Sequence, residues 1–494
     1  MRKNGILMPV FSLPSPYGIG TFGRAAFDFV DFLHKAKQSY WQILPLNPTN
    51  YGDSPYQSFS SFAGNPYFID LDLLVEDGLL IAAEIASYDF GDDAERVDYE
   101  KLYDNRFKIL KIAFNRFKAN DSYREFEKQN SHWLESYALF MAIKQYYGGK
   151  AWYKWPEPLK TREPDALANA KKSLEKDIAF HKFLQFNFNK QWLSLKKYAN
   201  QRGIEIIGDI PIYVALDSAD VWANPKQFLL DRDYTPKAVA GVPPDAFSAD
   251  GQLWGNPLYD WNYMKHTGYV WWKQYLGHAL SRYDVVRIDH FRGFESFFAI
   301  PYGDTNAKKG KWIKGPDTDL FDAFKAEFGE NLPIIAEDLG VITPAVRKML
   351  KSTGFPGMKV LQFAFDGDSS NAYLPHNLCR NCVIYTGTHD NDTIMGWLKN
   401  EKSAARGAKE YLNYQNDNGF NWAMMKAAMA SIADTCILMM SDLLGLDSSG
   451  RINTPSTVGD NWQWRIKSEC INDWLANILK ENTVMYGREN NSQL

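Results

Sequence analysis

Three carboxylic acids in this chain stand at the ends of short apolar runs, and that setting fits chemistry on a glycosidic bond. Asp209, Asp289 and Glu337 each close a run that is rich in isoleucine or valine. Cleavage of a glycosidic bond with retention of configuration needs one carboxylate as nucleophile and a second, protonated carboxyl group that donates to the leaving oxygen. The sequence therefore predicts a site in which two such acids act as a pair.

The residues around two of these acids suit them to different roles. Arg287 and Asp289 are two positions apart, so their side chains lie on the same side of a strand, and the guanidinium would keep Asp289 ionised. Glu337 follows the apolar run 334–336, where partial desolvation would raise its pKa and retain the proton that a general acid must deliver.

A fourth acid follows another apolar run. Asp390 lies in the segment 386–392, where a buried Asp390 could bind sugar hydroxyls while His389 donates a hydrogen bond beside it. Each acid taken alone could instead cap a helix or form an ion pair. The position of these acids at strand ends favours one shared site.

The elements that must position these acids alternate between strand and helix patterns. Helical patterns cover 25–36, 270–281, 320–328, 344–352 and 421–432. Such alternation is typical of βα units, and in a (β/α)8 barrel the carboxyl ends of the strands face the active site. The predicted strands cover 40–44, 204–209, 284–289, 333–337, 359–363, 383–386 and 435–440.

We therefore expect the α/β class, with a single catalytic (β/α)8 TIM barrel over 1–494. Residues 75–180 interrupt the alternation with charged, aromatic, helix-patterned sequence, and residues 212–268 interrupt it with a loop region rich in proline, glycine and tryptophan. We interpret the first range as an inserted helical subdomain and the second as an inserted loop subdomain near the active site. No internal repeat or flexible linker divides the chain into a string of domains.

Composition argues against several classes of function. The chain has 494 residues and a formal net charge of −4, so it offers no basic field for nucleic acid. No window approaches the roughly 18 to 20 apolar residues of a membrane span, and Pro9, Pro14 and Pro16 break up the first apolar run before an export signal is complete. Four cysteines fit a reducing compartment. We expect a cytoplasmic protein and leave its oligomeric state open.

Two motifs that could hold a cofactor or a metal lack the necessary context. Gly18-Ile-Gly-Thr-Phe-Gly23 matches the dinucleotide fingerprint, but the next strand ends at Leu44-Pro45 where a ribose-binding acid is required. Cys379-Arg-Asn-Cys382 has neither a second cysteine pair nor a His-x-His partner. We interpret the first as a tightly turned loop and the second as ordinary thiols, and we expect no cofactor and no metal.

Several long motifs follow one another from end to end of the chain. They cover residues 15–20, 51–67, 208–214, 241–248, 254–259, 287–293, 336–340, 387–392, 453–455 and 461–464. In this order they resemble the amylomaltase, or disproportionating enzyme, family, which is glycoside hydrolase family 77. The resemblance implies an α-amylase-clan barrel with no separate C-terminal β-sandwich domain.

The resemblance also implies roles for individual residues. Asp289 would be the nucleophile, Glu337 the acid/base and Asp390 the stabiliser of the transition state. Trp254 would serve the acceptor side, and Tyr51 would lie at a more remote glucan-binding surface. The remaining substrate-binding residues that it implies are Tyr56, Asp209, Arg287, His389 and Asn453.

The loop 241–250 bears on how a sugar rather than water takes the reacting group. Its paired prolines stiffen it, while Phe247 and Trp254 offer apolar faces that could cover a covalent intermediate and stack an incoming glucose. The same aromatic residues could instead only pack the loop onto the barrel. Phe247 joins Trp254 as a substrate-binding candidate.

These observations together predict a cofactor-free 4-α-glucanotransferase that moves α-1,4-glucan segments through a covalent intermediate on Asp289. Its partners would be an α-1,4-glucan donor and an α-1,4-glucan acceptor, with no nucleic acid and no membrane. Two alternatives stay open. An α-glucan hydrolase would release new reducing ends in place of transfer products, and a non-catalytic glucan-binding protein would leave maltotriose unchanged.

Overall fold

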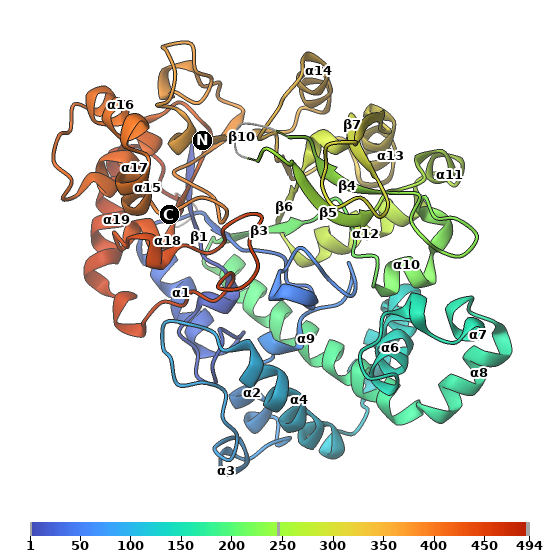
Figure 1. Cartoon of the computed structure of the whole chain (residues 1–494). Helices are drawn as coiled ribbons and strands as arrows, with labels where there is room; N and C mark the ends of the chain where they lie inside the picture. The colour runs from blue at the N-terminus through green and yellow to red at the C-terminus, as the bar shows by residue number, and fades with distance from the viewer. Residues whose placement is uncertain (1, 245–247, 491–494) are drawn as a thin grey trace.

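A closed barrel of parallel strands forms the centre of the computed structural model, which describes residues 2–244 and 248–490 (Figure 1). Neighbouring strands follow the order of the sequence, and β1 closes the ring by pairing with β12. This topology confirms the predicted (β/α)8 class. The barrel strands are β1 (Lys3–Leu7), β2 (Tyr40–Gln42), β3 (Glu205–Ile210), β6 (Val285–Ile288), β9 (Ile334–Ala336), β10 (Gly357–Val360), β11 (Cys382–Tyr385) and β12 (Thr435–Met439).

Helices between and after the strands surround the barrel and share its hydrophobic core, which includes the fully buried Trp41, Trp192 and Trp272. The connection from β10 to β11 differs, because its described elements are the 3-10 helices η7 (Leu361–Phe363) and η8 (Pro375–Asn377). One of the eight repeats therefore lacks an α-helix. The surrounding helices include α1 (Arg24–Lys35), α9 (Glu175–Gln201), α12 (Val270–Arg282), α13 (Thr318–Phe328), α14 (Pro344–Thr353), α17 (Phe420–Ala430) and α19 (Asp473–Met485).

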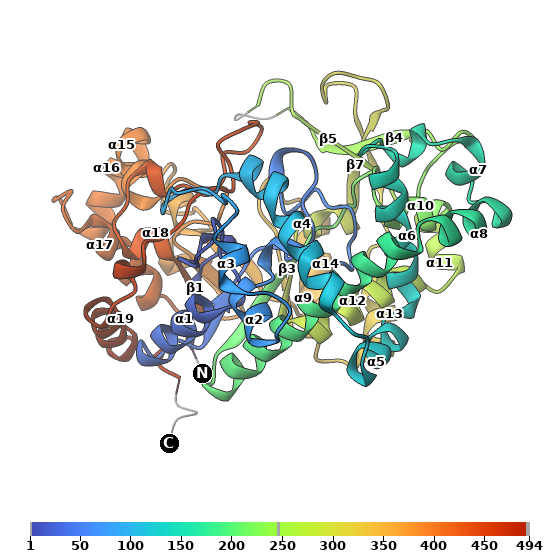
Figure 2. The same cartoon turned by 90° about the horizontal axis from the view of Figure 1, so that it is seen from below.

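A long, mostly helical segment separates β2 from β3. Both views place α7 and α8 of this segment at the periphery, far from the barrel strands (Figures 1 and 2). We propose that 75–180 is a helical subdomain inserted into the barrel. The elements between β2 and α9 are η2 (Tyr51–Asp53), η3 (Pro66–Phe68), α2 (Leu71–Glu76), α3 (Ala82–Ile85), α4 (Tyr99–Arg116), α5 (Asp121–Gln129), α6 (Ser131–Tyr146), η4 (Trp152–Lys154), α7 (Glu157–Lys160) and α8 (Pro164–Ser173).

A four-stranded antiparallel sheet, which sequence patterns did not reveal, stands on the side of the barrel opposite the two chain ends (Figure 2). Its strands, in spatial order, are β5 (Gln252–Pro257), β4 (Ala238–Val242), β7 (Ser296–Pro301) and β8 (Lys311–Lys314). Two strands come from the range 212–268 and two come from beyond β6. We propose that 212–268 is an inserted subdomain that completes its sheet with β7 and β8. The helices of that range are α10 (Ala219–Ala223), η5 (Pro225–Gln227) and α11 (Trp261–His266).

The remaining elements are helical. After β12 the described chain carries no further named strand. Among the described residues, no helix combines the length and the apolar character needed to cross a bilayer. The elements not yet named are η1 (Val10–Ser12), η6 (Phe291–Phe294), α15 (Ile394–Asn400), α16 (Lys402–Leu412), α18 (Met440–Leu443), η9 (Ser448–Gly450) and η10 (Ser468–Cys470).

Close packing explains the glycines of the 18–23 motif. A Cβ atom at Gly18, where φ is 82°, would lie 1.9 Å from the carbonyl oxygen of Phe90. A Cβ atom at Gly23 would lie 2.0 Å from Oδ2 of Asp70. Only glycine avoids such contacts, so the motif has a packing role as a tightly turned loop between η1 and α1.

Candidate active site

One guanidinium joins the carboxylates of two neighbouring strands at their carboxyl ends. In β6, Arg287 is in register with Asp209 of β3, and its Nη1 lies 2.5 Å from Oδ2 of Asp209. The Nη2 of Arg287 lies 3.0 Å from Oδ1 of Asp289, the residue that follows β6. Arg287 and Asp289 therefore share a side of the strand, as the two-residue period predicts.

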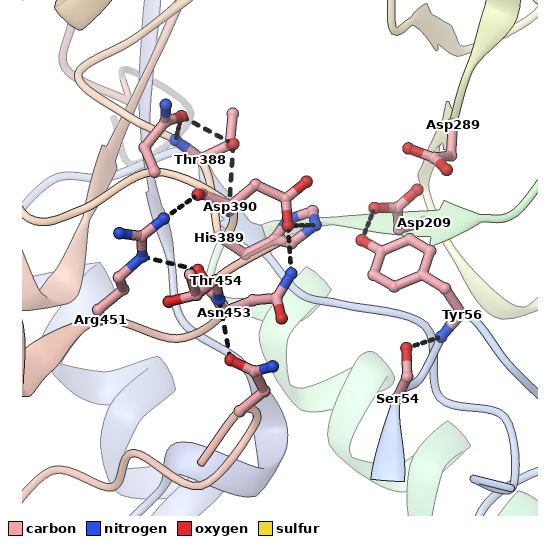
Figure 3. A network of polar contacts seen from close by, with 12 residues as sticks. Ser54, Tyr56, Asp209, Asp289, Thr388, His389, Asp390, Arg451, Asn453 and Thr454 are labelled. Atoms are coloured by element: carbon pink, nitrogen blue, oxygen red, sulfur yellow. Dashed lines mark hydrogen bonds and ion pairs between the residues drawn. The ribbon is translucent and has the colours of Figure 1, made fainter. Parts of the chain in front are cut away.

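Aromatic rings from three distant segments lie beside this ion-pair cluster, and Figure 3 shows two of them, those of Tyr56 and His389. Tyr56 donates a hydrogen bond from Oη to Oδ2 of Asp209 at 2.7 Å. Its ring stacks on the ring of His389, with centroids 5.1 Å apart and planes 19° apart. Trp462 packs on both rings, 5.8 Å from Tyr56 and 5.9 Å from His389. Asp209 is thus held by a cation and a phenol, and neither contact is local in sequence.

Asp390 faces the same region but is exposed, which corrects the expectation that it is buried. Its side chain retains 47% of its accessible surface, because it lies in a loop beyond the end of β11. Asn453 donates a hydrogen bond from Nδ2 to Oδ1 of Asp390 at 2.6 Å, and Nε2 of His389 lies 3.5 Å from the same oxygen. Arg451 donates to the backbone carbonyl of Asp390 at 2.9 Å. These contacts orient the carboxylate while leaving it accessible.

Asp289 and Asp390 both line one cavity of about 780 Å³. Figure 3 shows Asp289 and Asp209 on one side and Asp390 with Asn453 on the other. Asp209 and Arg287 are buried and do not belong to the lining. The other predicted residues that line the cavity are Tyr56, His389, Asn453 and Trp254.

Glu337 lies next to the nucleophile candidate but is held by the backbone. The backbone N–H of His290 donates to Oε2 of Glu337 at 2.7 Å, and that of Leu339 donates to Oε1 at 2.6 Å. Glu337 is 8% exposed and is not part of the cavity lining. His290, which follows Asp289, has φ 49° and ψ 47°, a left-handed conformation that is uncommon for a residue with a side chain. The acid/base candidate and the nucleophile candidate are therefore linked through one residue.

The protonation of this acid pair is set by opposing influences. Burial raises the pKa of Glu337, as the sequence predicts, although Arg287 and the two backbone N–H groups oppose the rise. Burial also raises the pKa of Asp289 to about 8, with help from nearby Asp209, Glu337 and Asp390 and against the pull of Arg287. This differs from the expectation that Arg287 keeps Asp289 ionised. Around neutral pH the pair as a whole retains a proton.

The structure describes the remaining substrate-binding candidates only in part. Trp254 of β5 lines the cavity, meets the ring of His290 edge to face at 4.9 Å, and donates from Nε1 to Oε1 of Gln252 at 3.0 Å. Phe247 lies outside the described residues. Tyr51 begins η2, and its side chain also lies outside the described part of the structure.

Several residues of the site were missed by sequence reasoning. Gln57 donates to Oδ1 of Asn256 at 3.1 Å on the cavity wall, and both residues, like Trp462, lie inside the long motifs. Those motifs were the feature of the sequence that could have identified these three residues as part of the site. The backbone N–H of His290 donates to Glu337, and the Arg451 side chain donates to the backbone carbonyl of Asp390. Each contact has a backbone group as one partner, so no pair of side-chain types in the sequence indicates it.

The described residues contain no group of three or more His, Cys, Asp or Glu side chains arranged to hold a metal ion. Cys379 is exposed and Cys382 begins β11, and both are free thiols. Burial of the Cys382 thiol raises its pKa to about 12, so it stays protonated at neutral pH.

Comparisons of the whole chain with known proteins give one consistent result. A model of glycoside hydrolase family 77, described as 4-alpha-glucanotransferase, matches residues 8–471. A 4-alpha-glucanotransferase of Clostridium butyricum is 49% identical over 97% of this chain and 100% of its own length. One from Thermus thermophilus is 47% identical over 94% of this chain and 95% of its own.

Solved structures show the same relationship. An amylomaltase from Streptococcus agalactiae, in complex with acarbose, has a TM-score of 0.96 and 43% identity, covering 99% of this chain and 100% of its own. An amylomaltase from Corynebacterium glutamicum has a TM-score of 0.77 at 18% identity, covering 99% of this chain and 74% of its own, and supports the fold alone.

Proposed function

The chain belongs to glycoside hydrolase family 77, the 4-alpha-glucanotransferases, and from this premise we propose that its cavity transfers α-1,4-glucan segments by a retaining double displacement. Family membership makes the protein a glycosyltransferase. The observation that carries the finer proposal is the placement of Asp289 and Asp390 on one cavity, with Glu337 joined to the residue after Asp289. Donor and acceptor are both α-1,4-glucans.

The proposed reaction has two balanced steps. First, the Asp289 carboxylate attacks the anomeric carbon, the bond to the departing glucan breaks, and the proton of Glu337 goes to the leaving oxygen. Second, the 4-hydroxyl of an acceptor glucan attacks the same carbon, Glu337 takes up its proton, and Asp289 leaves as a carboxylate. Arg287 fixes the position of Asp289, and Asp390, oriented by Asn453, binds hydroxyls of the reacting glucose.

Digestion of pure maltotriose tests this proposal. We expect glucose together with chains longer than maltotriose, because a transferred segment extends another substrate molecule. Glucose and maltose without longer chains would instead identify an α-glucan hydrolase. Unchanged maltotriose, in a folded sample, would identify a non-catalytic binding protein. The products should be resolved by chain length at several times, since hydrolysis accumulates reducing ends and transfer does not.

The pH dependence of kcat/KM should be bell-shaped, because the reactive form of the acid pair carries one proton. As pH rises through the upper pKa of the pair, the proton donor is lost and the rate falls. Since burial raises the pKa of both Glu337 and Asp289, this limb should lie well above the ordinary carboxyl range. As pH falls, Asp289 becomes protonated and the rate falls again. An alkaline limb at an ordinary carboxyl pKa near 4 would contradict the assignment.

Trp254→Ala should shift the enzyme from transfer toward hydrolysis. Water at about 55 M competes with the acceptor, so loss of a ring on the cavity wall should weaken acceptor binding more than water attack. The measurement is the ratio of transfer products to new reducing ends from maltotriose, well below the unfolding temperature. Trp474→Ala on α19, an exposed tryptophan outside the cavity lining, is the matched control. A Trp254 variant whose total rate falls at an unchanged ratio would show a packing role only.

A further inference from the structure

An exposed tryptophan near the acid/base candidate presents a flat surface that the mechanism above does not use. Trp312 of β8 keeps 40% of its accessible surface. The guanidinium carbon of Arg292 lies 3.8 Å from the centroid of its ring, and the ring of Phe298 meets it edge to face at 5.1 Å. One face of the indole is therefore held by a cation, and accessible ring surface remains.

Buried contacts fix the support beneath the indole. Arg292 is only 4% exposed and donates hydrogen bonds to the backbone carbonyl of Val341 and to Oγ of Ser296. A guanidinium stacked on an indole face is a favourable cation–π arrangement, and here it also limits the motion of the ring. An aromatic platform that is already ordered loses little conformational entropy when a ligand stacks on it.

The position of this platform relates it to the reacting bond. Arg292 comes from η6, just after Asp289, and its hydrogen bond to Val341 ties it to the loop that follows Glu337. Glu337 must face the oxygen that leaves in the first step and the oxygen that attacks in the second. Trp312 does not line the cavity, so an acceptor would reach it only with units that extend out of the cavity past the loop that follows Glu337.

We propose that the accessible surface of Trp312 is a distal acceptor subsite, which stacks a glucose unit of the incoming α-1,4-glucan beyond the unit that reacts. This inference rests on the proposed transfer function. Stacking on an indole suits a neutral sugar, which has flat apolar faces. Lys314, on the same strand, is already paired with Glu295 and Asp317.

The test measures how the acceptor KM depends on acceptor length. Starch serves as donor, and isotope-labelled glucose, maltose and longer maltooligosaccharides up to maltoheptaose serve as acceptors. For the wild-type protein, the acceptor KM should fall as the acceptor lengthens. In Trp312→Ala the KM for the longest acceptors should rise roughly two- to tenfold, the range expected for one lost stacking contact. The KM for glucose and the kcat should be unchanged.

Two further variants separate stacking from packing. Trp312→Phe keeps an aromatic face and should restore most of the length dependence. Ile313→Ala removes a neighbouring exposed side chain of the same strand and should leave the length dependence unchanged. Thermal unfolding of each variant shows whether the loss of the contact with Arg292 has altered the fold.

Several outcomes would overturn the subsite. An unaltered length dependence in Trp312→Ala would do so, as would an equal rise in KM for glucose and for long acceptors. A matching loss in Ile313→Ala would show that the effect belongs to the strand and not to the ring. If the wild-type protein transfers glucan to no acceptor of any length, the proposed function itself fails, and that result is distinct from failure of the subsite.

Discussion

Replacement of Asp289 by asparagine is expected to abolish glucan transfer and leave the fold intact. An amide cannot form the covalent intermediate, so the loss should be on the order of 10⁴-fold or more. Stability should change little, because the Asp289 side chain is 30% exposed and Arg287 keeps its ion pair with Asp209. Initial rates on maltotriose and thermal unfolding measure the two effects separately.

Asp442 provides the matched control for Asp289. It also follows a barrel strand, β12, and burial raises the pKa of its carboxyl group to about 7. Its oxygens accept hydrogen bonds from Oγ1 of Thr386 and from the backbone N–H of Ile394, and it does not line the cavity. Asp442→Asn should therefore lower the unfolding temperature and preserve kcat. If Asp289→Asn retains a tenth of the wild-type rate, Asp289 is not the nucleophile.

Replacement of Glu337 by glutamine is expected to slow both steps with natural substrates, by about 10² to 10⁴-fold. An α-glucosyl fluoride should restore the first step, because fluoride leaves without a proton. It should not restore the second step, because the acceptor hydroxyl still needs a base. The covalent intermediate on Asp289 should then accumulate and be visible by mass spectrometry of the intact protein. Absence of that species, with the activated donor consumed slowly, would place the acid/base elsewhere.

The backbone contacts of Glu337 mean that its replacement by glutamine also affects stability. Both oxygens accept backbone N–H groups, from His290 and Leu339, so glutamine must turn its own N–H donors toward one of them. One unsatisfied donor costs about 1 to 3 kcal/mol of stability. The ratio of rates on fluoride and natural donors is insensitive to that loss, whereas a single rate is not. Asp338→Asn, at an adjacent acid that accepts the N–H of Met358, controls for the local disturbance.

The proton of the acid pair connects these two predictions. In the structure, the backbone N–H bonds favour the ionised form of Glu337, whereas Arg287 favours the ionised forms of both acids. The reactive form needs the proton on Glu337. In Glu337→Gln with an activated donor, the alkaline limb of the first step should disappear, since no proton is delivered. Persistence of that limb would assign it to another group.

Local patterns in the sequence were sufficient for the barrel class and for part of the site, although they did not predict strand β1 (Lys3–Leu7). Strand and helix periods predicted the barrel, because each βα unit carries its own apolar pattern. The two-residue period predicted that Arg287 and Asp289 share a side, and the 3.0 Å ion pair confirms it. The apolar run before Glu337 predicted the direction of its pKa shift. Each of these inferences depends on neighbours in the chain.

Only the tertiary structure decided the features that depend on distant segments. The sheet formed by β4, β5, β7 and β8 joins strands from both sides of β6, and its register has no local signal. The exposure of Asp390 follows from its loop beyond β11, and the raised pKa of Asp289 follows from partial burial beside the carboxyl groups of other segments. Desolvation and long-range pairing are properties of the packed molecule, so no stretch of sequence determines them alone.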